Sequence, residues 1–262
     1  MKSILKAIGY LLFYVVFQIV MISIIVAMLG SSGSGMEEIE KIVNQNTLGL
    51  TILTNILTII VLLIFFKLRK KKLTTEINAR HIRIKNYILP SVIAFSYSMI
   101  FAFITYRLSF DNAENIKLSV EYYQNLFPYF GIIMQIIALL IVSPITEEIV
   151  CRGLILTTLQ KQYSNMFSVL FSGFLFGILH LMAGGMVLVL GSMVIGMIFG
   201  LIFVKTKSLL PAIVAHTIAN IPDFIMELLP ELSKEIQYFS IVFFTVIFGI
   251  AMYQFICKNK SA

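Results

Sequence analysis

The chain has 262 residues, of which 59% are hydrophobic and 13% are charged, and its mean hydropathy is +0.95. A soluble domain of this length carries about one quarter charged residues, so the composition excludes an ordinary soluble globular protein. The net charge of +7 suggests a nucleic-acid partner, but the distribution of the basic residues along the chain explains that charge by another route.

Apolar runs of about 20 residues recur along the chain, which is typical of a polytopic helical membrane protein. The first run follows Lys2 and Lys6 and resembles a signal peptide, but its 23 uncharged residues are too many for a signal-peptide core, so we interpret it as an uncleaved span. The short seventh run is interpreted as a helix that continues past Pro222 with a kink. The sequence thus predicts an all-α bundle of eight membrane spans: Ala7–Leu29, Thr47–Phe66, Tyr87–Tyr106, Leu126–Thr146, Met166–Ala183, Met186–Val204, Leu209–Ile221 and Tyr238–Cys257.

The charged residues test this prediction independently. With the N-terminus in the cytoplasm, the inner segments hold 16 of the 20 Lys and Arg residues, and the outer segments hold 10 of the 13 acidic residues. This asymmetry follows the positive-inside rule and predicts that both termini are cytoplasmic. The inner basic residues are Lys2, Lys6, Lys67, Arg69, Lys70, Lys71, Lys72, Arg80, Arg83, Lys85, Arg152, Lys161, Lys205, Lys207, Lys258 and Lys260.

We interpret residues 1–262 as a single integral membrane domain, with no nucleic-acid partner and no predicted oligomeric state. The abundance of Ile, Lys and Asn suggests an AT-rich bacterial genome, and hence a bacterial cytoplasmic membrane. The cluster 67-KLRKKK-72 is expected to rest against anionic lipid head groups, with a cytosolic partner as the alternative. GxxxG pairs at Gly173/Gly177 and Gly196/Gly200 are expected to let helices approach closely within the chain.

Charged residues interrupt the chain near the end of the fourth apolar run. Such residues cost about 2.5–3.5 kcal/mol each inside a span, so they persist when they are paired, line a cavity or serve a function. In a helix, Glu148 and Arg152 are four residues apart and can form an ion pair in the favoured acid-first order. Glu147 points about 100° away and is left without that partner. Pro144, just upstream, predicts a helix start or a kink that exposes backbone groups near this site.

Two later apolar runs contain further polar residues. Phe176 and His180 are four residues apart, and His216 and Asn220 repeat this spacing. Taken singly, a histidine is a common interhelical hydrogen-bond partner, and an asparagine often holds membrane helices together. Taken together, a free carboxylate, two histidines and an amide are the groups of a site that activates water.

Cys151 lies among the same charges and is a candidate nucleophile. No histidine is near it in sequence, and the neighbouring carboxylates disfavour the thiolate form. We therefore interpret Cys151, like Cys257, as a small hydrophobic residue, and two cysteines do not make a disulfide framework.

The motifs 147-EEIVCR-152, 176-FGILH-180 and 216-HTIAN-220, in this order among the apolar runs, resemble the CPBP family of CAAX proteases and bacteriocin-processing enzymes, also called the Abi family. The similar core covers residues 126–220, whereas the N-terminal spans, within residues 1–106, match only as hydrophobic segments. The resemblance implies an intramembrane endopeptidase whose substrate is a peptide or a lipidated protein in the membrane.

The resemblance also implies a role for each motif position. Glu147 and His180 would bind and deprotonate the attacking water. His216 and Asn220 would donate hydrogen bonds to the oxyanion of the tetrahedral intermediate, where one donor is typically worth about 3–4 kcal/mol. The residues in supporting roles would be Glu148, Arg152 and Phe176.

Members of this family are often labelled metalloproteases, and Glu147, His180 and His216 are residue types that can hold a zinc ion with an open position for water. Against zinc, the chain has no HExxH motif, and Asn220 is a poor zinc ligand but a good oxyanion donor. We favour a metal-independent mechanism based on glutamate and keep zinc as the alternative.

Three functions are weighed. The first is the endopeptidase, whose eukaryotic relatives remove the last three residues after a prenylated cysteine, and whose bacterial relatives are associated with peptide pheromones, bacteriocins or self-immunity. The second is a non-enzymatic membrane scaffold or immunity protein, which would tolerate Glu147→Gln. The third is a proton-coupled transporter that uses the same glutamate and histidines as a relay, but the repeated halves typical of transporters are absent from the sequence.

Overall fold

The computed structural model describes residues 2–107, 114–182, 185–228 and 232–258. All regular secondary structure among these residues is helical, and no strand occurs among them. Within these described ranges, six helices are long and apolar enough to cross a membrane, and two shorter apolar helices, Asn165–Leu179 and Leu210–Met226, accompany them. The predicted all-α polytopic membrane bundle is confirmed, while the total of eight spans stays a prediction.

The helices are connected by short segments, and the label η marks a π or 3-10 segment. In chain order they are α1 (Lys2–Ser31), α2 (Met36–Gln45), α3 (Thr47–Leu68), α4 (Leu73–Glu76), α5 (Lys85–Arg107), α6 (Glu114–Leu126), α7 (Phe130–Gln135), η1 (Ile136–Val142), α8 (Ser143–Glu148), η2 (Ile149–Leu156), α9 (Thr157–Gln160), α10 (Asn165–Leu179), η3 (His180–Met182), α11 (Met186–Thr206), α12 (Leu210–Ala219), α13 (Ile221–Leu228) and α14 (Lys234–Lys258).

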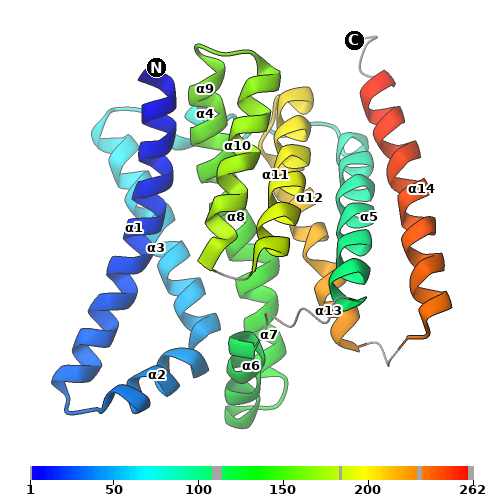
Figure 1. Cartoon of the computed structure of the whole chain (residues 1–262). Coiled ribbons are helices and arrows are strands. Elements are labelled where there is room, and N and C mark those ends of the chain that lie inside the picture. Colours follow the sequence, from blue (N-terminus) through cyan, green and yellow to red (C-terminus); the bar gives the residue numbers. More distant parts are fainter. Residues whose placement is uncertain (1, 108–113, 183–184, 229–231, 259–262) are drawn as a thin grey trace.

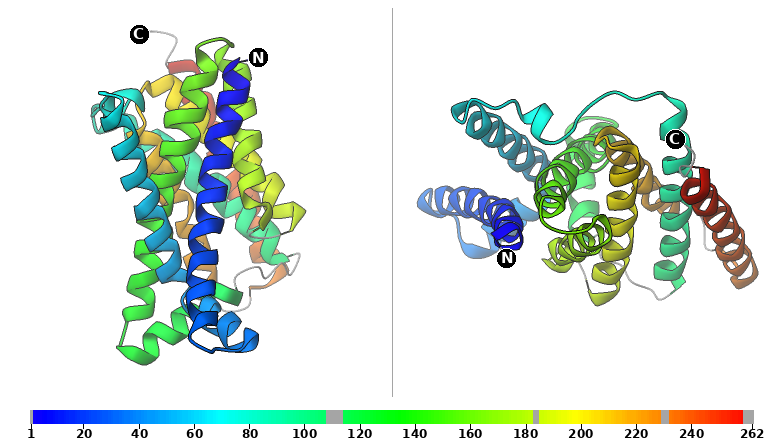
Figure 2. Two further views of the ribbon diagram at one scale, coloured as in Figure 1. Left: turned by 90° about the vertical axis from the view of Figure 1, so that its left-hand side faces the viewer. Right: turned by 90° about the horizontal axis from the view of Figure 1, so that it is seen from above.

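The bundle has a central group of helices and two flanks (Figures 1 and 2). The central group consists of α8, η2, α10, α11 and α12, and more than half of the buried side chains of the main apolar core cluster come from the last four of these elements. On one flank lie α1 and α3, joined at the lower end by α2, and on the other lie α5 and α14. The outermost helices α1 and α14 bury few residues and expose many large apolar side chains, as expected of helices that face lipid.

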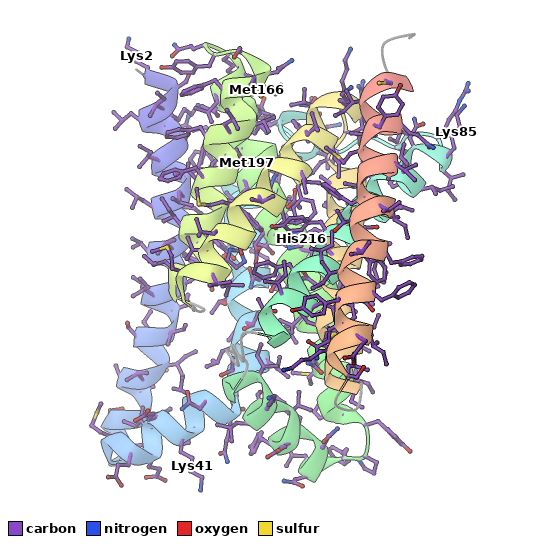
Figure 3. All side chains as sticks on the ribbon, turned by 45° about the vertical axis from the view of Figure 1, so that its right-hand side comes forward. Lys2, Lys41, Lys85, Met166, Met197 and His216 are labelled. Atoms are coloured by element: carbon purple, nitrogen blue, oxygen red, sulfur yellow. The ribbon has the colours of Figure 1, made fainter. Side chains whose placement is uncertain are left out.

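The two ends of the bundle differ in charge as the sequence predicts. Lys2, Lys85 and Met166 lie at the upper end, whereas Lys41 lies at the lower end (Figure 3). Helix α1 begins and α14 ends at the upper end. The segments assigned to the cytoplasmic side therefore lie together, and the chain is an integral, multi-pass membrane protein.

The fourth apolar helix differs from the prediction. It was expected to end at Thr146, but it runs without interruption from Phe130 to Gln160. Arg152, which the charge pattern assigned to an inner loop, is fully buried inside the bundle. The helix continues past its charges because these groups face protein and contact one another, so they are shielded from lipid. The polar motif consequently lies within a span and not at its end.

Pro144 neither starts nor breaks this helix. A proline has no N–H. In an α-helix that N–H would bond the carbonyl four residues earlier, and in a π-helix it would bond the carbonyl five residues earlier, so neither carbonyl receives a donor from residue 144. These are the carbonyls of Leu140 and Leu139, and η1 covers both. Side chains of α12 supply the missing donors, because Thr217 donates to Leu140 at 2.7 Å and Asn220 donates to Leu139 at 2.8 Å. Pro144 thus leaves two backbone carbonyls without a helical donor, as expected, and the bonds to these carbonyls join α12 to this helix.

The helices α10 and α11 form a closely packed hairpin. A side chain at Gly177 would meet the carbonyl oxygen of Val189 at 2.8 Å, and one at Gly196 would meet the side chain of Phe176 at 2.9 Å. The expectation that the two GxxxG pairs allow close approach within the chain is confirmed. This hairpin brings Phe176 beside Arg152 of η2 and His216 of α12, and His180 contacts Phe176 one turn further along.

The loop between α3 and α5 packs against the upper end of the core. A Cβ at Gly153, in η2, would meet Ile77 at 2.7–2.8 Å, so this loop lies directly against the helix that carries the polar motif. The loop also bonds to the turn between α11 and α12, where Ser208 donates to the carbonyl of Arg80 at 2.5 Å and Arg80 donates to the carbonyl of Lys207 at 2.8 Å. Arg80, one of the basic residues assigned to the inner side, is therefore built into the fold.

Candidate active site

The predicted pair of Glu148 and Arg152 is present and completely buried. A terminal nitrogen of Arg152 donates to Oε1 of Glu148 at 2.7 Å, and both side chains have no exposed surface. A second nitrogen of Arg152 donates to the carbonyl of Gly196 at 2.6 Å, which ties η2 to α11. Because a buried charge is stable only when it is paired and hydrogen-bonded, this pair anchors the centre of the bundle.

Two aromatic rings complete the surroundings of the guanidinium. The central carbon of Arg152 lies 4.5 Å from the ring centroid of Phe176 and 5.3 Å from that of Phe199. Contacts of this kind stabilise a cation by about 2 kcal/mol or more when water is excluded. Phe176, which the sequence placed only on the same face as His180, is therefore a direct partner of Arg152.

His216 connects the buried pair to the second glutamate. Its Nδ1 lies 3.0 Å from Oε1 of Glu148, its Nε2 lies 3.9 Å from Oε2 of Glu147, and its ring stacks on Phe199 at 4.7 Å. The ring is almost completely buried and lies near the middle of the bundle's height (Figure 3). The hydrogen bond from His216 to Glu148 was not expected from the sequence.

Glu147 is the carboxylate that the pair leaves free, as the helical geometry predicts. Its side chain is 18% exposed, and its buried Oε2 has no hydrogen-bond partner. The distance of 3.9 Å to His216 is too long for a hydrogen bond. Glu147 therefore keeps an unused acceptor, and it is the one of the two glutamates that has exposed surface.

His180 lies where α10 ends, at the turn of the hairpin. Its Nδ1 lies 2.9 Å from the carbonyl oxygen of Phe176, and its ring lies 4.8 Å from the Phe176 ring. Since a carbonyl only accepts, Nδ1 carries the proton and Nε2 is left as an acceptor in the neutral ring. No hydrogen bond or ion pair joins His180 to Glu147 in the described parts of the chain, so the site brings His216, and not His180, nearest to Glu147.

Asn220 lies at the end of α12 and uses one amide hydrogen for the carbonyl of Leu139. An amide nitrogen has two hydrogens, so one donor is left for another partner. Thr217, whose hydroxyl bonds the neighbouring carbonyl, was missed by the sequence reasoning. The sequence signal for such a donor was Pro144, because a proline leaves two backbone carbonyls without helical hydrogen bonds. It does not indicate which helix supplies the donors.

Cys151 lies on the same helix turn, but its side chain is completely buried, and the backbone carbonyl of the residue accepts a hydrogen bond from Ser172 at 2.9 Å. This environment is that of a structural residue and gives no support to a role as a nucleophile.

A zinc ion, the alternative to a metal-independent site, would bind to Glu147, His180 and His216. Both Nδ1 atoms are occupied, one by a backbone carbonyl and one by Glu148. Across the residues that the structure describes, no group of three or more His, Cys, Asp or Glu side chains is arranged to hold a metal ion. The structure thus gives no support to three converging protein ligands, but zinc stays the alternative, because a histidine that binds a metal through Nε2 often donates its other ring N–H to a carboxylate or a carbonyl.

Comparison with known proteins gives one match. Residues 129–222, just over a third of the chain, match the model of the family described as Rce1-like, type II CAAX prenyl endopeptidase. No curated protein and no solved structure matches the chain. The matched segment begins just before α7 and ends just after α12, so it contains every polar residue described above.

Proposed function

We propose, from the premise that residues 129–222 belong to the CAAX protease (CPBP) family, that this chain is an intramembrane endopeptidase in which Glu147 activates the attacking water. The substrate in this proposal is a membrane-associated or lipidated protein or peptide. Membership of the family supports a CAAX-type endopeptidase; the residues, mechanism and substrate named below are our inference.

The unequal surroundings of the two glutamates carry the proposal. Glu148 has no exposed surface and is held by Arg152 and His216, so it cannot approach a substrate. Glu147 is partly exposed, and its Oε2 has no partner. Two adjacent carboxylates with different environments take different roles, and the free one is suited to act as a general base.

The tautomer of His216 supports a role beside Glu147. Its Nδ1 donates to the carboxylate of Glu148, which orients the ring and leaves Nε2 facing Glu147 as a proton acceptor. A carboxylate that fixes a histidine in this way also stabilises the imidazolium that forms when Nε2 is protonated. When Glu147 passes the proton that it took from the water to Nε2, His216 donates to the developing oxyanion, with the second amide hydrogen of Asn220 as a further donor, and the same proton later goes to the departing nitrogen.

The proposed reaction consumes one water molecule for each peptide bond that is cleaved. The water oxygen bonds to the scissile carbonyl carbon while Glu147 takes one of its protons, and His180 accepts a hydrogen bond from the same water through Nε2. The tetrahedral intermediate collapses when its C–N bond breaks and the proton passes to the departing nitrogen. The products are a carboxylic acid and an amine, and no other reactant is consumed.

Purified wild type and three variants in detergent test the proposal. The variants are Glu147→Gln, His180→Ala and, as a matched control for loss of one acid, Glu37→Gln, which lies in the exposed first turn of α2. Each is assayed on a library of fluorogenic and lipidated peptides with and without a chelator. We expect a loss of about 10²–10⁴-fold for the first two variants and none for the control, in both conditions.

Other outcomes identify the alternatives. Activity that the chelator abolishes and zinc restores would make Glu147, His180 and His216 metal ligands. Equal cleavage by Glu147→Gln and wild type would remove Glu147 from the site. If wild type cleaves no peptide and Glu147→Gln retains the cellular function of wild type, the chain acts as a scaffold.

A further inference from the structure

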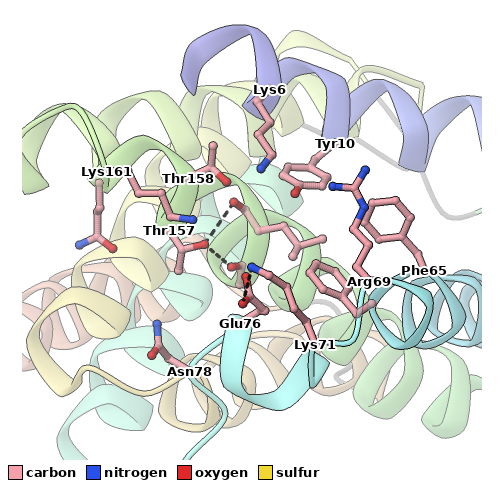
Figure 4. A pocket seen from close by; sticks show the side chains of 14 residues that line it. Lys6, Tyr10, Phe65, Arg69, Lys71, Glu76, Asn78, Thr157, Thr158 and Lys161 are labelled. Carbon is pink, nitrogen blue, oxygen red and sulfur yellow. Dashed lines mark hydrogen bonds and ion pairs between the residues drawn. The ribbon is translucent and has the colours of Figure 1, made fainter. Parts of the chain in front are cut away.

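A cavity of about 250 Å³ lies at the upper, cytoplasmic end of the bundle, apart from the site described above. It lies between α1, the end of α3 with the loop that follows, and the η2–α9 helix (Figure 4). Because a water molecule occupies about 30 Å³ of liquid, the cavity has room for several waters, or for one phosphate group with its first linking atoms.

The lining of this cavity is strongly basic. Lys6, Arg69, Lys71 and Lys161 line it, and Glu76 is the only acidic residue among the lining residues. Glu76 is already held by Lys71 at 2.9 Å. Lys6, Arg69 and Lys161 form no ion pair in the described parts of the chain, so three cations are available to an anion in the cavity.

The three cations lie around the rim of the cavity and stay exposed. Figure 4 shows the side chains of Lys6, Arg69 and Lys161 around the hollow, although they come from three separate helices or helix ends. Arg69 lies 4.6 Å over the ring of Phe65, and Lys6 lies 5.8 Å over the ring of Tyr10. Such contacts hold a cation in place without neutralising it.

Neutral donors lie beside the cations. Tyr10 and Thr158 line the cavity, and neither hydroxyl has a hydrogen-bond partner in the described parts of the chain. Three cations and two hydroxyls match a phosphate, which presents several strong acceptor oxygens to Lys, Arg and hydroxyl donors.

We propose that this cavity binds one phosphate group, supplied by the head group of an anionic membrane lipid. The cavity lies at the end where the cytoplasmic leaflet carries anionic head groups, and its wall α1 faces lipid. A bound phosphate would connect α1, α3 and the η2–α9 helix. The cavity is close to the buried polar motif, because its lining includes Gly153, the residue after Arg152. This inference does not depend on the proposed protease activity.

The test uses the full chain in a zwitterionic detergent, titrated separately with dioctanoyl phosphatidic acid, dioctanoyl phosphatidylcholine and inorganic phosphate. Native mass spectrometry counts the bound molecules, and thermal denaturation reports stabilisation. Arg69→Gln and Lys161→Gln change the cavity, whereas Lys72→Gln and Arg83→Gln remove one exposed positive charge each outside it. All four side chains are exposed, so the folded bundle should tolerate each change.

We expect one phosphatidic acid to bind saturably to wild type and raise its melting temperature. Each cavity variant should bind it about tenfold more weakly, and each control should bind within about twofold of wild type. Equal weakening in the controls, or a lack of saturation, would show diffuse surface attraction and overturn the proposal. Inorganic phosphate binding as tightly as the lipid would keep the phosphate site but assign it to a soluble ligand. Equal binding of phosphatidylcholine would overturn the requirement for an anion.

Discussion

His216 of α12 and Glu148 of α8 share a hydrogen bond of 3.0 Å, and the same oxygen of Glu148 also accepts from Arg152 at 2.7 Å. One carboxylate oxygen thus holds a histidine on one side and a guanidinium on the other, while Oε2 of Glu148 has no partner. The contact joins the first and third sequence motifs. It makes Glu148 the structural centre of the site and leaves Glu147 as its reactive neighbour.

Glu148→Gln should therefore lower stability, and Glu147→Gln should lower activity. The first change leaves the guanidinium of Arg152 buried without its counter-charge, and we expect the free energy of unfolding to fall by about 3–5 kcal/mol. The second changes a carboxylate whose Oε2 accepts no hydrogen bond and lies 3.9 Å from His216, so unfolding should shift by less than about 1 kcal/mol while cleavage is lost. Denaturant titration in mixed micelles and the peptide assay measure the two effects. Equal stability of the two variants would contradict the assignment of roles.

The carbonyls freed by Pro144 give a second prediction. Thr217→Val removes the donor to Leu140, and we expect a loss of about 1–3 kcal/mol in the free energy of unfolding. In a Pro144→Ala background, residue 144 regains an N–H that can bond the same carbonyl, so the Thr217→Val change should cost much less. The double-mutant cycle measures this coupling.

Thr245→Val is the matched control for that cycle, because the hydroxyl of Thr245 bonds only a carbonyl of its own exposed helix. It should change stability by about 0.5 kcal/mol or less in either background. A Thr217→Val cost that is unchanged by Pro144→Ala would mean that the proline is not the cause of the interhelical bond.

Much of this arrangement follows from local sequence patterns. Hydropathy locates the apolar helices, the positions of lysine and arginine place the segments at either end, and the four-residue spacing pairs Glu148 with Arg152. Helical periodicity acts within one segment, and the bilayer acts on each segment separately. These three predictions therefore needed no knowledge of contacts between segments.

Contacts between segments were beyond that reasoning. A hydropathy window treats Glu147 to Arg152 as an interruption, so the fourth helix was ended too early. No short sequence spacing indicates the bond between His216 and Glu148 or the bond between Thr217 and Leu140, because these residues are 68 and 77 positions apart. Such contacts depend on the crossing of α12 over α8 and η1, which is set by packing.

The hairpin of α10 and α11 provides a third prediction. Gly177→Ala places a Cβ 2.8 Å from the backbone oxygen of Val189, and backbone cannot move aside as the end of a side chain can. We expect a loss of about 1–3 kcal/mol in the free energy of unfolding. Gly249→Ala, in α14, meets nothing within 4 Å, and should be neutral or stabilising by up to about 1 kcal/mol through helix propensity. If both variants are equally stable, the hairpin is not closely packed at Gly177.

The orientation of the bundle is the last prediction, and single cysteines test it. Cys257 is exposed and is replaced by serine, whereas Cys151 is fully buried and is kept, so the parent should not react with a maleimide. A cysteine at Lys41 should be labelled by a membrane-impermeant maleimide in intact spheroplasts, because the positive-inside rule places α2 outside. A cysteine at Lys72 should be labelled only after the membrane is permeabilised. The reverse pattern would invert the topology and would place the basic cavity on the outer face, away from the anionic cytoplasmic leaflet that our lipid proposal requires.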